Sequence, residues 1–165
     1  MIEMDFLAYS LSAIVAFSGL FVGAFLARSA KSEMPTASRY LPWLQKILVI
    51  AVAALFFSHF RVNTALKLIV YAAIIVFLLR AQINFYPFLA VVFFMLGQSP
   101  GSLFSVSALV FLCGFPAGSM FIIGTRKRMG RYTVAKALLR KHGIFLLIAI
   151  GLQFFYSLLI FRSFG

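Results

Sequence analysis

The sequence has very few acidic residues. Glu3, Asp5 and Glu33 carry its only carboxylate side chains, against 15 Lys and Arg. All three lie at the chain start or in a polar segment between apolar runs. Proton relays, carboxylate-bound sodium or metal ions and paired-acid hydrolysis all need acidic groups inside the protein. The sequence therefore predicts none of these chemistries, and no metal ion or cofactor.

Cysteine and histidine are also scarce. The sequence contains one cysteine, Cys113, and two histidines, His59 and His142. A single cysteine excludes an intramolecular disulfide and a cysteine-based metal cluster. The two histidines are expected near opposite faces of the membrane, so a Cys–His nucleophile pair is not expected. We expect no enzyme activity. A lipid-modifying enzyme that uses His59 and Arg61 is the least favoured class.

Apolar residues are abundant. They make up 64% of the chain, and only 11% of its residues are charged. The mean hydropathy of +1.07 leaves too little polar surface for a soluble fold of 165 residues. The net charge of +12 comes from cations that flank apolar runs. This pattern favours an anionic lipid leaflet as partner and argues against nucleic acid.

The apolar runs predict an all-α, polytopic membrane protein with one integral membrane domain over residues 1–165 and about six transmembrane helices. The expected spans cover residues 6–27, 43–60, 64–79, 83–97, 103–124 and 143–161. Spans 64–79 and 83–97 are shorter than the roughly 20 residues that a crossing needs. They are either two tight crossings or a hairpin that enters the bilayer only in part.

Two basic segments set the expected orientation. Residues 28–46 and 125–142 hold most of the cations, so the positive-inside rule places both in the cytoplasm. An even number of crossings between them, and six in total, then puts both termini outside. Within the second segment, Tyr132, Ala135, Leu138 and Leu139 share one helical face. Residues 131–141 are therefore either an interfacial helix on the cytoplasmic leaflet or a solvated loop.

The first and fifth spans match each other without a gap. Residues 9–23 align with residues 104–118, and Ser10, Ser12, Ala13, Val15, Gly19 and Gly23 are identical to Ser105, Ser107, Ala108, Val110, Gly114 and Gly118. After a shift of register, residues 50–57 resemble residues 148–155. This predicts a duplicated helical hairpin, spans one–two and five–six, related by an axis along the membrane normal. The alternative is chance, since short matches arise easily in apolar sequence.

Small residues recur every fourth position in both matched spans. Gly19, Gly23 and Ala27 share one helical face, as do Gly114 and Gly118. Such faces let helix backbones approach closely, and they drive helix packing where no hydrophobic effect operates. We interpret them as packing faces, used either within the chain or between chains.

Polar residues and prolines inside the expected spans mark a candidate substrate pathway. Pro87 and Pro116 interrupt helical hydrogen bonding, and broken helices form substrate sites in transporters. They also simply end helices near an interface. The residues expected to line the pathway are Asn84, Pro87, Pro116, Gln153 and Tyr156.

A second set of residues predicts contact with an anion or a lipid headgroup. His59 and Arg61 lie where the second span ends, and Arg131 and Arg140 lie in the basic segment 125–142. Their side chains pair with phosphate, or they are ordinary polar residues that terminate a helix.

Together these observations favour a small membrane permease or channel-like protein for a neutral or anionic small molecule or a lipid, since a cationic cargo would find no acidic ligand. The alternative is a non-catalytic structural or assembly subunit of a larger membrane complex. Few buried polar groups and the small-residue faces support that alternative. Besides the lipid bilayer, the expected partners are therefore either further copies of the chain in a homo-oligomer or a larger membrane complex.

Overall fold

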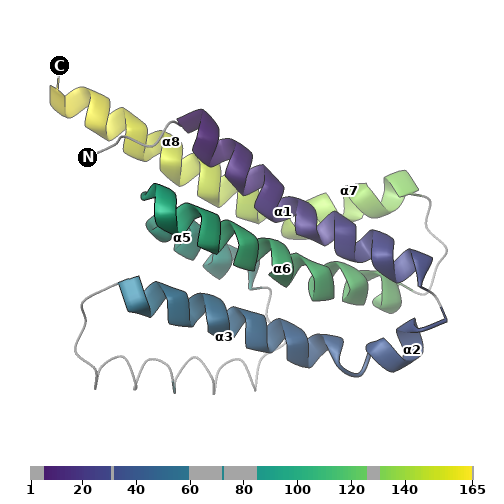
Figure 1. Ribbon diagram of the computed structural model, residues 1–165. Helices are drawn as coiled ribbons and strands as arrows, with labels where there is room; N and C mark the ends of the chain where they lie inside the picture. The colour runs from purple at the N-terminus through teal and green to yellow at the C-terminus, as the bar shows by residue number, and fades with distance from the viewer. Residues whose placement is uncertain (1–5, 31, 60–71, 73–84, 126–130, 165) are drawn as a thin grey trace.

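The computed structural model describes residues 6–30, 32–59, 72, 85–125 and 131–164, most of which are helical. In order the helices are α1 (Phe6–Ser29), α2 (Met34–Ala37), α3 (Leu41–His59), α5 (Tyr86–Leu96), α6 (Pro100–Gly124), α7 (Arg131–His142) and α8 (Ile144–Phe164) (Figure 1). Because α2 is a single turn, the described residues form six longer helices. The predicted all-α class is confirmed for this part of the chain.

Three helices, α1, α3 and α6, are long and apolar enough to cross a membrane, and they match the expected spans 6–27, 43–60 and 103–124. A fourth crossing results if α7 and α8, bent by 53° at a short break, count as one broken span. The protein is thus a multi-pass membrane protein by the composition of its helices. The expected span 64–79 lies outside the described residues.

The expected span 83–97 contains only α5. Its 11 residues extend about 17 Å, against about 30 Å of hydrocarbon in a bilayer. The described part of this stretch is therefore too short to be a complete crossing. Six spans are expected from the sequence, and the described helices supply three or four.

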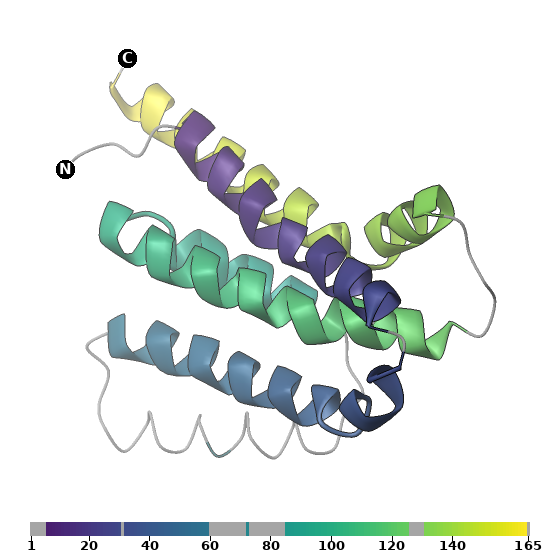
Figure 2. The ribbon, with the colours of Figure 1, turned by 45° about the vertical axis from the view of Figure 1, so that its right-hand side comes forward.

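The helices form a bundle in which α1 and α6 run side by side in the same direction (Figures 1 and 2). α3, α5 and α8 run the opposite way. The start of α1 and the end of α8 lie at one end of the bundle, while α2 and α7 lie toward the other. We call these the terminal end and the basic end.

α1 and α6 make backbone contact, because both use glycine where they meet. A side chain at Gly19 would collide with the carbonyl of Phe111, and one at Gly114 would collide with the backbone of Gly19. The hydroxyl of Ser119 on α6 donates a hydrogen bond of 2.9 Å to the carbonyl of Gly23 on α1. The small-residue faces noted in the sequence are therefore used within the chain.

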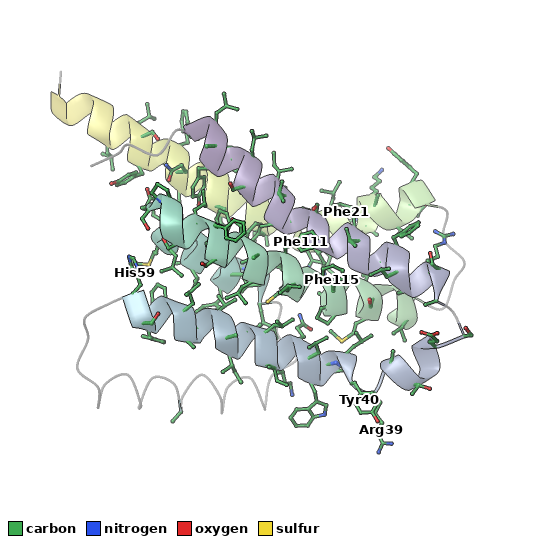
Figure 3. All side chains as sticks on the ribbon, viewed as in Figure 1. Phe21, Arg39, Tyr40, His59, Phe111 and Phe115 are labelled. Carbon is green, nitrogen blue, oxygen red and sulfur yellow. The ribbon has the colours of Figure 1, made fainter. Side chains whose placement is uncertain are left out.

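The predicted repeat relates two contacts between α1 and α6 to each other. A Cβ atom at Gly23 would meet the carbonyl of Phe115, and a Cβ atom at Gly118 would meet the carbonyl of Leu20. The repeat register aligns Gly23 with Gly118 and Leu20 with Phe115. Figure 3 labels Phe111 and Phe115 on the stretch of α6 that faces α1.

The turn between α5 and α6 is shorter than residues 98–102, where the sequence predicts it. Ser99 has extended backbone angles (φ −116°, ψ 138°) and precedes Pro100, the first residue of α6. Proline suits this position because its missing N–H would have no helical partner there. Further along, α6 continues through the buried Pro116 as one helix.

Candidate functional site

α7 forms a helix, which is one of the two alternatives expected for residues 131–141. Leu138 and His142, four residues apart, are buried, and Val134 is partly buried. Of the other residues on the predicted apolar face, Tyr132 is 81% exposed and Leu139 is also exposed. α7 contacts α1, α6 and α8, so tertiary packing selects the face that is buried within the protein.

α7 ends at His142, and Gly143 separates it from α8. The Gly143 N–H donates to the carbonyl of Leu139 at 2.7 Å, and the Leu147 N–H donates to the carbonyl of Gly143 at 3.3 Å. The two helices meet at 53°. Figure 2 shows the bend between them. Because Phe145 stacks on Phe17 near the middle of α1 (centroids 6.1 Å apart, planes 10°), this break lies deep along the bundle.

α5 begins at the same place. The ring of Tyr86, its first residue, lies 4.5 Å from the His142 ring and 6.3 Å from the Phe145 ring, measured between centroids. We call the group formed by Tyr86, His142, Gly143 and Phe145 the junction. It brings the N-termini of two helices, α5 and α8, next to one another.

Neither of these N-termini is capped by a side chain. Phe85 occupies the N-cap position of α5 without a side-chain hydrogen bond, and Gly143, which precedes α8, has no side chain. The first N–H groups of a helix have no partner within that helix, and they carry partial positive charge. Two such ends side by side favour a negatively charged ligand.

His142 adds a polar group to the junction. It is only 6% exposed, and its buried Nδ1 atom has no hydrogen-bond partner in the described part of the chain. The neighbouring cations are Lys141, which interacts electrostatically with His142, and Arg140. The Lys141 Nζ atom lies 5.6 Å from the ring of Phe121 on α6. Among the described residues the single carboxylate, Glu33, is exposed and precedes α2.

Sequence reasoning missed His142, because the basic residues around it suggested a cytoplasmic segment. A usable signal was present: the His–Gly pair stands where a basic amphipathic stretch meets an apolar run. Glycine at such a boundary is typical of a helix end.

A row of buried aromatic rings separates the junction from the terminal end of the bundle. The rings of Tyr9 and Phe93 have centroids 5.3 Å apart, and those of Phe93 and Phe145 have centroids 5.7 Å apart. Tyr9, Phe93 and Phe145 are fully buried. These rings fill the space between α1, α5 and α8, so they close the bundle on the terminal side of the junction.

Beyond this row, Gln153 of α8 is 2% exposed and pairs with Gln98. The Gln98 Nε2 atom donates to the Gln153 Oε1 atom at 2.8 Å and to the carbonyl of Phe94 at 3.0 Å. The ring of Tyr156 lies edge-on to Phe94, with centroids 6.1 Å apart. The Gln98 and Gln153 side chains thus have a partner within the protein, which is the expected arrangement for a buried amide.

The residues expected to line one pathway lie at several levels of the bundle. Pro87 is in the first turn of α5, beside the junction, whereas Gln153 and Tyr156 contact Gln98 and Phe94 near the end of α5. Pro116 lies about 24 Å along α6 from Pro100. Pro100 follows the α5–α6 turn, where Gln98 pairs with Gln153. Asn84 lies outside the described residues.

The residues expected to bind an anion or a lipid headgroup are also dispersed. His59 is exposed at the terminal end of α3, whereas Arg39 and Tyr40 lie at its other end, as Figure 3 shows. Arg131 is the first residue of α7 and Arg140 is exposed near its end. His59 is therefore separated from both of these arginines. Arg61 lies outside the described residues.

Groups of three or more metal-ligating side chains do not occur among the described residues. Comparisons with known protein families, with curated protein sequences and with solved structures find no match to this chain. The functional argument therefore rests on the junction itself.

Proposed function

We propose that the protein is a small membrane permease for a small anion, with the junction as its substrate-binding point. The observation that carries this proposal is the meeting of two uncapped helix N-termini, those of α5 and α8, beside the buried His142 ring. Interrupted helices whose N-termini face the middle of the membrane bind anionic groups in known transporter folds. Phe145 stacks on Phe17 near the middle of α1, which supports that depth.

Charge supports an anionic cargo over a cationic one. Lys141 and Arg140 adjoin the junction, and no described residue there carries a carboxylate. A cation would meet helix N-termini and lysine in a poorly solvated place, where like charges repel strongly. A small anion finds N–H donors and the His142 ring instead.

The aromatic row supports a permease rather than an open channel. Tyr9, Phe93 and Phe145 contact one another without solvent exposure, so in this conformation the junction is closed toward the terminal end. Transport then requires these rings to separate, which is the behaviour of a carrier with alternating access.

The alternative, an assembly subunit, loses part of its support. Gly19, Gly23, Gly114 and Gly118 pack against the backbones of α1 and α6, so these faces are occupied within the chain. Light scattering of the protein extracted in mild detergent, with mass spectrometry of co-eluting proteins, separates the two proposals. A stoichiometric larger partner would favour the subunit, whereas a lone monomer or homo-oligomer would favour the permease.

We further propose that the basic end faces the cytoplasm and that both chain termini lie outside. α2 and α7 at one end of the bundle, with the start of α1 and the end of α8 at the other, support this orientation (Figure 1). Arg131 and Arg140 of α7 would then contact anionic lipid headgroups. The same placement leaves segment 28–46 and the start of α7 toward one side of the membrane, as the positive-inside rule expects, whereas His142 at the end of α7 lies deeper in the bundle.

Anion flux in liposomes tests the proposed function. Purified protein is reconstituted, and uptake of chloride, nitrate, inorganic phosphate and potassium is measured with radiolabels. We expect uptake of at least one anion, no uptake of potassium, and at least tenfold slower anion uptake in His142→Phe, which keeps an aromatic ring beside Tyr86. Lys136→Gln, which removes an exposed cation from the same helix, is the control and retains the wild-type rate.

Three results would contradict the proposal. Equal uptake of potassium would point to non-selective leakage. Wild-type anion flux in a monodisperse His142→Phe variant would remove the junction from the pathway. Transfer of a fluorescent anionic lipid between leaflets without any anion uptake would assign the protein to lipid movement instead.

A further inference from the structure

The junction holds a histidine without an acidic partner. Nδ1 of His142 is buried and has no hydrogen-bond partner among the described residues. Imidazole is the side chain that gains or loses a proton near neutral pH. In the described part of the chain, the titratable groups around it are Tyr86 of α5, Cys113 of α6, and Arg140 and Lys141 of α7, none of which supplies negative charge at neutral pH.

The helices that complete the surroundings add no carboxylate. α1 contributes the ring of Phe17, which stacks on Phe145. The charged residue of α1 is Arg28, in the last turn of the helix. α8 contributes Phe145 itself, and the first residues after it are apolar. A protonated His142 therefore has no counter-ion from any described element that packs against the junction.

A charge buried without a counter-ion is unstable, and this applies equally to an imidazolium and to a bound anion. When both are present, each is the counter-ion of the other. Their binding is then mutually favourable, and the coupling is reciprocal: the anion strengthens proton binding by the same factor by which the proton strengthens anion binding.

We propose that His142 carries one proton together with one monovalent anion, so that the two cross the membrane as a neutral pair. The inference rests on the proposed permease function. On one side, the Nδ1 lone pair accepts a proton from water and the new N–H donates a hydrogen bond to the anion. On the other side, the anion leaves and Nδ1 returns its proton to water, which restores the neutral ring.

Proton-coupled uptake tests this assignment. Liposomes that contain the protein are loaded with the pH-sensitive dye pyranine, and the membrane potential is fixed with valinomycin and potassium gradients. Chloride, nitrate and inorganic phosphate serve as probes, each followed by radiolabel and dye together. We expect one proton to enter with each chloride or nitrate ion and the rate of their uptake to be the same at all potentials.

His142→Gln keeps a hydrogen-bonding side chain but does not carry a proton at neutral pH. We expect it to lose the dye acidification, and we expect any remaining anion uptake to depend on membrane potential. Lys136→Gln, on the exposed face of α7, keeps the wild-type coupling. Gel filtration confirms that each variant is monodisperse before it is assayed.

The outcomes separate the inference from the function on which it rests. Wild-type anion uptake that is driven by potential and leaves the dye unchanged would overturn proton coupling but keep the permease. Acidification that persists in His142→Gln would overturn the role of His142. Failure of the wild-type protein to take up any probe would overturn the permease itself, and the inference with it.

Discussion

The imidazole of His142 lies 4.5 Å from the phenol ring of Tyr86, measured between ring centroids. One residue ends α7 and the other begins α5, so the contact joins two helix ends far apart in the sequence. Both side chains are nearly inaccessible to solvent. This contact places a polar ring where two helices begin, and the proposed function follows from it.

Close backbone contact between α1 and α6 makes glycine obligatory there. In Gly23→Val the new side chain meets the carbonyl of Phe115, and the helices must separate. We expect a loss of about 3 kcal/mol in stability and a fall of about 10 °C in the unfolding temperature in detergent. Gly151→Val, at a helical glycine with open space, is the matched control and should remain within about 2 °C of wild type. Equal losses in both variants would contradict the contact.

The amide pair Gln98–Gln153 should be energetically coupled. Each single change to leucine removes one partner of the 2.8 Å hydrogen bond, and the double change removes both. We expect a coupling energy of about 1 kcal/mol from the double-mutant cycle, measured by denaturation in mixed micelles. Strictly additive losses would show that the bond contributes nothing. If Gln153 also lines a pathway, as the sequence predicts, Gln153→Leu abolishes anion uptake in addition.

Ser119 should contribute more than serines that bond within their own helix. Its hydroxyl joins α6 to α1 at Gly23, whereas the hydroxyl of Ser18 donates to Val15 of the same helix. Ser119→Ala should therefore lower stability by about 0.6 to 1.7 kcal/mol, and Ser18→Ala should leave it almost unchanged. The same unfolding assay compares the two variants. A larger effect at Ser18 would contradict the assignment.

Cysteine labelling measures the orientation in the membrane, because the native Cys113 is buried and each variant adds one accessible thiol. Gly101→Cys places a thiol in open space at the α5–α6 turn, and Thr36→Cys places one on the exposed face of α2. In intact cells a membrane-impermeant maleimide should label the first variant and reach the second only after permeabilisation. The reverse pattern would invert the proposed topology. Wild-type protein is the control, because it measures the background labelling of Cys113.

Much of the fold could be predicted from the sequence because long apolar helices leave few options in a membrane. The ends of α1, α3 and α6 lie within a few residues of the expected spans. The close approach of α1 and α6 was implied by Gly19, Gly23, Gly114 and Gly118, since glycine spacing encodes a helix face directly. The duplicated hairpin stays a prediction.

The candidate site could not be predicted in the same way. Hydropathy reports how apolar a stretch is, but it does not report which helix ends meet. Pro87 was noted as a residue that interrupts a helix, yet the preceding Tyr86 contacts His142, which belongs to a distant basic stretch. Only the three-dimensional arrangement of α5, α7 and α8 brings these residues together. The face that α7 buries within the protein could not be predicted for the same reason, because its neighbours select it.

The glycine contacts between α1 and α6 also have a mechanical consequence. Two backbones that touch have no side chains between them that can rotate and repack, so sliding or tilting one helix opens a gap along the other. α1 and α6 are therefore expected to move together as one rigid unit. α5, α7 and α8 meet instead through rings such as those of Tyr86 and Phe145, which can turn about their own bonds. Under the proposed permease function, the displacement that carries a ligand past Phe145 is therefore a movement of these three helices against the α1–α6 pair.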